Sequence, residues 1–260
     1  MKKSTEVAKT KGVELAKTDD MEAMFAGDAG RGLENVDKDC FAIPFLTILQ
    51  SGSPQCKKSD GAYIKGAEEG MLFNTVTKDL YDGTDGILFL PCAFVRRMVE
   101  WVPKEDGGGY RGDYSPAEAP SIVRDDEGND VLPNGHHLVD TRYHYGYIVD
   151  ASTGVTSVAV LAMAKTQLKK SKHWITIMDA IRMDGPAGKF NPPTYSHLYK
   201  ITTVPESNDK GSWFGWNILM ESPVSSASLY STGKQLNILV REGKAKAAEP
   251  ASDEVGGDKF

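Results

Sequence analysis

A lysine-rich stretch presents the clearest chemistry in this sequence. Residues 164–174 read Ala-Lys-Thr-Gln-Leu-Lys-Lys-Ser-Lys-His-Trp, within a chain whose formal net charge is −6. On a helix of about 3.6 residues per turn, Lys165, Lys169 and Lys172 would share one stripe, with Lys170 beside it. Clustered ammonium groups repel one another unless an anion neutralises them, so the stripe suits a phosphate backbone. The alternative is a solvated surface stripe without a ligand.

The opposite half of such a helix is apolar and would hold the helix against a core. That half is formed by Leu161, Ala164, Leu168, Ile175 and Met178. Trp174 falls about 180° from Lys165 on an ideal helix, within the apolar half. We therefore expect Trp174 to anchor the helix while the lysines face outward.

A tyrosine-rich segment is the second candidate for chemistry. Residues 141–150 read Thr-Arg-Tyr-His-Tyr-Gly-Tyr-Ile-Val-Asp. The alternation of a β-strand puts Tyr143, Tyr145 and Tyr147 on one face and the intervening residues on the other. Aromatic rings on the solvent side of a sheet can stack nucleic-acid bases, which contributes about 1–3 kcal/mol per base. An ordinary half-buried packing surface is the alternative.

Both groups need β-strands to hold them. The strongest strand candidate is 87–102, with a bend or bulge near Pro91. Alternation separates Arg96 from Arg97 in this strand, so neither face is cleanly apolar and at least one face is exposed. Further elements are an edge strand or short helix within 42–50, strands at 71–77, 155–160, 195–204 and 213–220, a loop at 205–211, a helix at 225–240, and a loop or β-hairpin insertion over 104–134.

The composition is that of an ordinary soluble protein. The chain has 260 residues, 40 % hydrophobic and 25 % charged, and its apolar runs are too short to span a bilayer. The N-terminus lacks the apolar core of a secretory signal, so we expect a cytoplasmic protein without a membrane partner. Cys40, Cys56 and Cys92 form no metal-binding pattern, which predicts free thiols and no structural zinc.

Motifs for catalysis are missing from the sequence. It contains neither a phosphate-binding glycine loop nor a nucleophile turn of the Gly-x-Ser-x-Gly type. The adjacent His136 and His137 would face opposite ways in a strand, and no third ligand is placed beside them. We therefore expect no enzyme, no cofactor and no metal. A metal-dependent DNA-processing nuclease stays open, because carboxylates that are distant in sequence can converge on an ion.

Domain boundaries follow from composition. Residues 1–35 read as a flexible N-terminal arm with a short helix over 20–25, because they cannot bury enough apolar surface to offset their ordering entropy. Residues 241–260 read as a disordered acidic tail. Between them, 36–240 form one mainly β (α+β) domain, for which strands, an intervening helix, hairpin insertions and aromatic strand faces favour a β-barrel of the oligonucleotide-binding (OB) type. An anionic tail can occupy a cationic groove when DNA is absent.

The sequence resembles bacteriophage-encoded single-stranded DNA-binding proteins, which combine an OB fold with a disordered acidic tail that ends in an aromatic residue. The segments 70–77 (Gly-Met-Leu-Phe-Asn-Thr-Val-Thr), 167–174 and 249–260 carry the resemblance. It implies a protein of the host cytoplasm that coats single-stranded DNA, without strong sequence preference, during replication, recombination or repair. It also implies that the tail recruits replication or recombination proteins.

The candidate site residues fall into three groups. For the DNA backbone they are Lys165, Lys169, Lys170, Lys172, Arg96, Arg97 and Arg142; for base stacking Tyr143, Tyr145, Tyr147, Trp101, Tyr110 and Trp213; for partner binding by the tail Asp253, Glu254, Asp258 and Phe260. A homo-oligomer is left open. Besides the nuclease, the alternative function is that of a non-enzymatic phage protein that binds a host protein.

Overall fold

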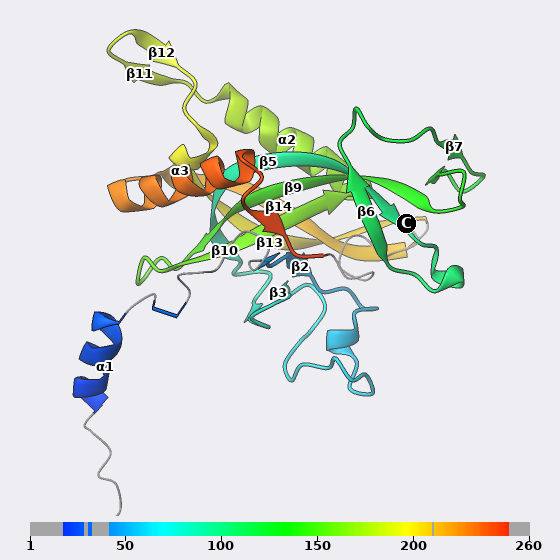
Figure 1. Cartoon of the computed structure of the whole chain (residues 1–260), viewed down its shortest axis with the longest axis horizontal. Helices are drawn as coiled ribbons and strands as arrows, with labels where there is room; N and C mark the ends of the chain where they lie inside the picture. The colour runs from blue at the N-terminus through cyan, green and yellow to red at the C-terminus, as the bar shows by residue number, and fades with distance from the viewer. Residues whose placement is uncertain (1–17, 29–30, 33–41, 210, 250–260) are drawn as a thin grey trace, which may run out of the picture. The chain divides into compact units, whose positions relative to one another are not determined.

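The computed structural model describes residues 18–28, 31–32, 42–209 and 211–249 (Figure 1). The chain divides into two units, Met1–Cys40 and Phe41–Phe260. In the first unit, helix α1 (Thr18–Gly27) confirms the short helix expected near residues 20–25. The remainder of the predicted arm up to residue 17, together with Cys40, lies outside the described residues.

An eight-stranded sheet forms the centre of the second unit. Its strand order is β14-β13-β5-β9-β8-β7, with β10 also paired to β9 and β6 also paired to β5. The sheet curls, as Figure 1 shows for the long strands. The bounds are β5 (Ile87–Trp101), β6 (Tyr110–Tyr114), β7 (Val123–Arg124), β8 (Asp130–Val131), β9 (His137–Val149), β10 (Thr156–Ala164), β13 (His197–Asn208) and β14 (Gly211–Pro223). The prediction of a mainly β chain is confirmed, whereas the OB-type assignment stays a prediction.

Strand β5 bends where the sequence indicates. It pairs antiparallel with β9 from Leu88 to Trp101, and the register shifts between Pro91 and Ala93. Pro91 has no backbone N–H to donate to the ladder, so a bulge beside it is the arrangement that a paired strand tolerates. The predicted bulge is therefore confirmed.

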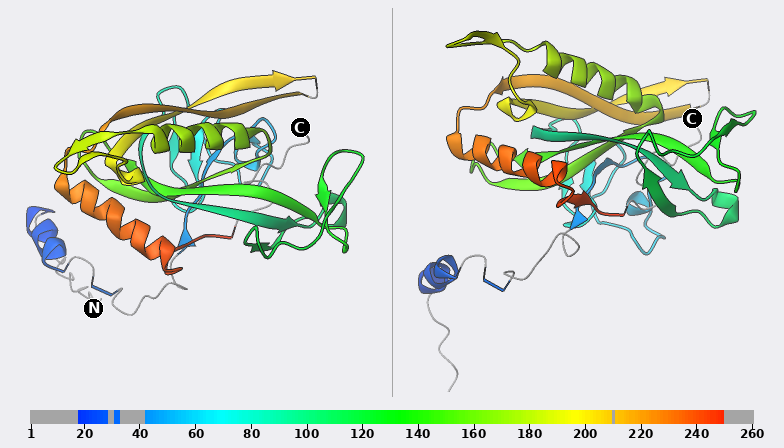
Figure 2. Two further views of the ribbon diagram at one scale, coloured as in Figure 1. Left: turned by 90° about the horizontal axis from the view of Figure 1, so that it is seen from above. Right: turned by 45° about the horizontal axis from the view of Figure 1, so that its top comes forward.

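Each face of β9 packs against a different helix. Tyr143 and Tyr145 share a core cluster with Leu236 of α3 (Ala227–Arg241). On the opposite face, Ile148 shares a cluster with Trp174 of α2 (Leu168–Ala180). Figure 2 shows α2 alongside the β13–β14 hairpin and α3 on another side of the sheet. The predicted alternation of the tyrosine segment is confirmed, but both of its faces are covered.

His144 fixes α2 to β9. Its ring stacks on Trp174 with centroids 4.6 Å apart, and its Nε2 lies 2.8 Å from Oγ of Ser171. Burial, with a smaller contribution from the charge of Arg142, lowers the pKa of His144 to about 3. The imidazole is therefore neutral at neutral pH. Trp174 is 1 % exposed, which confirms its predicted role as an anchor.

The predicted lysine helix is wrong at its start. Strand β10 runs through Ala164, which pairs with Thr141, so Leu161 and Ala164 belong to a strand. A short 3₁₀ turn (Lys165–Gln167) follows, and α2 begins at Leu168. Lys165 therefore does not share a helical stripe with Lys169 and Lys172. Pairing with β9 overrides the helical periodicity of the segment, as tertiary contacts commonly do.

Near its start, the edge strand β14 forms backbone hydrogen bonds with a side chain from another part of the chain. Gln50 donates from Nε2 to the carbonyl oxygen of Phe214 at 2.9 Å, and the Phe214 N–H donates to Oε1 of Gln50 at 2.8 Å. The N–H of Trp216 likewise donates to Oε1 of Gln167 at 3.1 Å. These three backbone groups of β14 thus have side-chain partners.

Short elements complete the unit. A three-stranded sheet consists of β2 (Leu46–Ile48), β3 (Leu72–Asn74) and β4 (Leu80–Tyr81). A hairpin is formed by β11 (Met183–Gly185) and β12 (Gly188–Phe190), and β1 (Ala42–Ile43) pairs in parallel with β15 (Lys246–Ala247). Three further 3₁₀ turns lie at Pro54–Cys56, Lys104–Asp106 and Thr194–Ser196. No helix in the described part of the chain is both long and apolar enough to cross a membrane.

Three boundaries differ from prediction. Residues 241–249 were expected in the tail, but α3 extends to Arg241 and β15 follows it, because β1 supplies a partner for the chain. The loop expected at 205–211 instead belongs to the β13–β14 hairpin, which pairs as far as Asn208 and Gly211. The 104–134 insertion contains β6, β7 and β8, so the hairpin alternative holds there.

Candidate functional site

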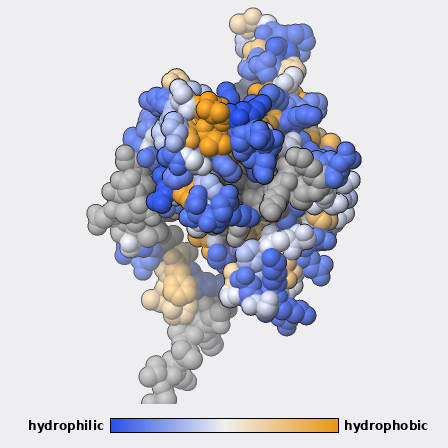
Figure 3. Space-filling view, turned by 90° about the vertical axis from the view of Figure 1, so that its right-hand side faces the viewer, coloured by the Kyte–Doolittle hydropathy of each residue, from blue (hydrophilic) through white to orange (hydrophobic). Residues whose placement is uncertain are grey.

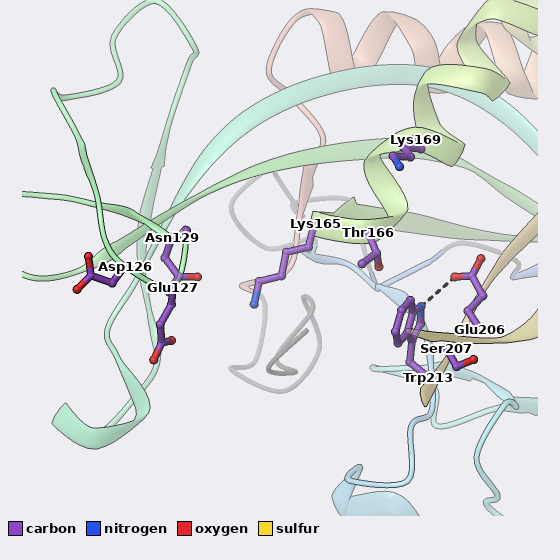
Figure 4. Close-up of a pocket in the computed structure, with 10 residues that line it drawn as sticks. Asp126, Glu127, Asn129, Lys165, Thr166, Lys169, Glu206, Ser207 and Trp213 are labelled. Atoms are coloured by element: carbon purple, nitrogen blue, oxygen red, sulfur yellow. Dashed lines mark hydrogen bonds between the residues drawn. The ribbon is translucent and has the colours of Figure 1, made fainter. Parts of the chain in front are cut away.

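A groove of about 1300 Å³ lies among three parts of the sheet unit. One side is the turn between β7 and β8, the second is the 3₁₀ turn with the start of α2, and the third is the end of the β13–β14 hairpin (Figure 4). Its charged and aromatic lining residues are Asp126, Glu127, Lys165, Lys169, Glu206 and Trp213. Hydrophilic residues cover most of the face shown in Figure 3, on the side where β6 and β7 lie in Figure 1, and the most prominent hydrophobic patch there is compact.

The cationic wall of the groove comes from the end of β10 and the start of α2. Lys165 and Lys169 are exposed and line the groove. Lys165 has φ 48, a left-handed conformation that turns the chain from strand into helix. Lys172 is also exposed, but it does not line the groove. The wall is thus built on a turn and a helix terminus that sheet pairing holds in place.

Glu206 connects the second and third sides of the groove. Its Oε2 accepts hydrogen bonds from Nε1 of Trp213 at 2.9 Å and from Nε2 of Gln167 at 3.2 Å. Nζ of Lys170 lies 2.7 Å from Oε1 of Glu206. Burial raises the pKa of this carboxyl, but its three hydrogen-bond donors outweigh burial and hold that pKa below its ordinary value. Lys170 is therefore part of a fixed ion pair.

Gly215 makes room for this network. A Cβ added at Gly215 would lie 2.2 Å from Oε2 of Glu206 and 2.6 Å from Nζ of Lys170. Both distances are shorter than nonbonded atoms tolerate. Gly215 pairs with Val204 in the hairpin, so the ends of the Glu206 and Lys170 side chains, rather than the backbone, would have to move to admit a Cβ. The ion pair in its present position therefore requires a glycine at 215.

The acidic wall is the turn that joins β7 to β8. Asp125 Oδ1 accepts from the Asn129 N–H at 2.7 Å, and its Oδ2 accepts from Nδ2 of Asn129 at 3.0 Å. Hydrogen bonds from Asn129 lower the pKa of Asp125. This closed turn leaves Asp126 and Glu127 exposed at its tip, where Figure 4 shows them on the side opposite the lysines.

The three arginines predicted to bind the DNA backbone lie outside the groove. Arg96 forms two hydrogen bonds with Asp140, both at 2.9 Å, and Nε of Arg97 lies 3.2 Å from Asp113. Arg142 is 8 % exposed. These side chains lie on β5 and β9, and the structure does not bring them together with the lysines.

Burial contradicts half of the predicted stacking residues. Tyr143, Tyr145 and Trp101 are 5 %, 6 % and 8 % exposed, so their faces are not open to a base. Tyr147 is half-buried against the same core cluster. Tyr110 is half-buried, packs edge-on against Trp101 and donates to Asp113. Of the six predicted residues, Trp213 alone lines the groove. The tail residues Asp253, Glu254, Asp258 and Phe260 lie outside the described residues.

Sequence reasoning missed Glu206, Gln167 and Gly215. The sequence predicts a loop over 205–211, which hides the position of Glu206 directly across the hairpin from Trp213. A hairpin predicted to its full length would have paired the two residues. The acidic turn could have been found from its Asp-Asp-Glu-Gly-Asn sequence, but its place opposite the lysines depends on the curl of the sheet.

The histidines, acidic side chains and thiols of the described residues are the remaining candidates for chemistry. No group of three or more His, Cys, Asp or Glu side chains among the described residues is placed to hold a metal ion. His136 is instead 2.6 Å from Glu100, which also accepts a hydrogen bond from Tyr114. Cys56 and Cys92 are free thiols, as predicted.

The protein is therefore mainly β and carries a groove that is cationic on one side and acidic on the other. The chain belongs to the family described as Pam3 phage gp34-like protein, whose model matches residues 9–246. That description names a bacteriophage protein, in agreement with the phage origin expected from the sequence. No curated protein and no solved structure matches the chain.

Proposed function

We propose that this protein binds single-stranded DNA in the groove and protects it during phage DNA replication, recombination or repair in the host cytoplasm. The observation that carries the proposal is the presence of two exposed lysines and the Trp213 indole in one groove. Lysines that neutralise phosphates release counterions, and an indole face stacks on any base. Together these contacts bind a strand without reading its sequence.

The network around Glu206 supports a stacking role for Trp213. A ring that is tied through Nε1 loses little conformational freedom when a base packs on it, because its orientation is set before binding. The cationic contacts then come from Lys165 and Lys169, with Lys172 one turn further along α2. Phage family membership and the resemblance of the sequence to phage single-stranded DNA-binding proteins support the same function. An OB-type barrel and recruitment of partners by the tail belong to this proposal.

Fluorescence anisotropy with a labelled single strand of about 16 nucleotides, the upper end of the site size of one OB fold, tests the proposal. We expect binding at low salt that weakens steeply as salt increases. The variant K165Q/K169Q should bind more weakly. K57Q/K58Q, which changes two exposed lysines outside the groove, is the matched control. An intact protein that shows no binding at low salt would contradict the function.

A further inference from the structure

We infer that Asp126 and Glu127 make the groove selective for one strand by repelling the second backbone of a duplex. This inference rests on the proposed function and concerns the specificity of the same groove. Both residues line the groove across from Lys165 and Lys169. A purely cationic groove would attract single and double strands alike, so the opposed charges need an explanation.

The backbone of Asp126 and Glu127 is held beside the groove by the hydrogen bonds of their turn. The backbone N–H of Asp125 donates to the Asn129 carbonyl at 3.0 Å, and the Gly128 N–H donates to the Asp125 carbonyl at 3.0 Å. Gly128 has φ +88, the left-handed conformation that closes such a turn. Asp130 is engaged by Arg124 at 3.2 Å. Asp125 and Asp130 thus maintain the turn. Asp126 and Glu127 lie at its tip and line the groove on the side opposite the lysines, and the Asp126 carboxylate is directed away from Lys165 (Figure 4).

A single strand satisfies both walls of the groove. Its one phosphate backbone can lie along Lys165 and Lys169, and its uncharged bases then turn toward Trp213 and the acidic turn. A duplex carries two backbones. When one of them lies on the lysine wall, the other approaches the side of Asp126 and Glu127, where phosphates and carboxylates repel each other. Repulsion between unit charges at contact distance on a protein surface weakens binding by about tenfold or more.

The test compares single-stranded and duplex forms of one labelled oligonucleotide at one low salt concentration. We expect D126N/E127Q to bind the duplex about tenfold more tightly than the unmodified protein, while its affinity for the single strand rises by less than about threefold. The variant removes two charges but keeps side chains of the same size. Because both positions are exposed, the fold should be unaffected, which thermal unfolding checks.

The control is E68Q/E69Q, which removes the same two charges from exposed positions outside the groove. It should leave the ratio of single-strand to duplex affinity unchanged. A ratio that is equal in D126N/E127Q and in the unmodified protein would overturn the inference, as would an equal change in both variants. Failure of the unmodified protein to bind the single strand would instead overturn the proposed function, so the two failures are distinguishable.

Discussion

Trp213 donates a hydrogen bond from Nε1 to Oε2 of Glu206 at 2.9 Å, and the two residues face each other across the β13–β14 hairpin. The same carboxylate is paired with Lys170 of α2. One acidic side chain therefore fixes an aromatic ring on a hairpin to a helix that carries lysines. The Trp213–Glu206 hydrogen bond thereby joins the aromatic and the cationic parts of the proposed binding site.

Replacing Trp213 should weaken DNA binding without unfolding the protein. W213A removes the indole that lines the groove, and the expected loss is about 1–3 kcal/mol of binding free energy. Titration with a labelled single strand measures it. F190A, which removes an exposed ring on the β11–β12 hairpin, is the control and should bind as the unmodified protein does. Equal affinities of W213A and F190A would show that the indole does not stack.

An alanine at Gly215 should destabilise the fold. The added Cβ would collide with Glu206 and Lys170, and a collision in a packed site typically costs about 1–3 kcal/mol of unfolding free energy. Chemical denaturation measures the difference. G61A is the matched control, because a Cβ at Gly61 meets no atom within 4 Å. Its stability should change by less than about 0.5 kcal/mol. A neutral G215A would mean that the ion pair can move aside without loss.

The salt dependence of DNA binding should separate lysines from arginines. Each phosphate contact with a single strand contributes about 0.7 to the slope of log affinity against log salt. K165Q/K169Q should therefore reduce the slope by about 1.4. R96Q/R97Q should leave it nearly unchanged, because these arginines are paired with aspartates outside the groove. If R96Q/R97Q reduced the slope and K165Q/K169Q did not, the phosphate backbone of the DNA would lie on β5.

Acid should destabilise the protein through His144. Its pKa is about 3 in the folded protein and 6.5 when unperturbed, so the unfolded chain takes up the proton first. The stability due to neutral His144 is complete above pH 6.5 and is lost as the pH falls toward 3, by up to about 1.4 kcal/mol per pH unit. H144Q should be less stable at neutral pH, and its deficit should narrow in acid. Denaturation at several pH values, with the exposed H173Q as control, measures this. A loss of stability in H144Q that stays the same at every pH would contradict this prediction.

Local sequence patterns predict those features that depend only on a residue and its neighbours along the chain. Pro91 marked the bulge in β5, and the tyrosines of β9 alternated as expected. Alternation says which residues share a face, but not whether another element covers that face. The ring of Tyr143 packs against Phe45, with centroids 5.8 Å apart, so its burial depends on a residue far earlier in the chain.

The candidate site depended still more on distant contacts. Lys165 and Lys169 were found from their charge, and Trp213 from its ring. Their convergence with Asp126 requires the curl of the sheet, which no local pattern encodes. Lys165 itself was placed in a helix because the periodicity of 164–174 is helical, although strand pairing with Thr141 extends through Ala164. Site residues were thus recognisable individually, while their grouping was not.

The paired hydrogen bonds between Gln50 and Phe214 have a further consequence for how this protein behaves in a crowded cell. A side-chain amide carries the same donor and acceptor as a peptide group, so Gln50 imitates one residue of a neighbouring strand. An unoccupied edge is a template onto which another chain can add, and repeated addition leads to fibres. By occupying both backbone groups of Phe214, Gln50 blocks the addition of another strand at this point of the β14 edge, beside the groove.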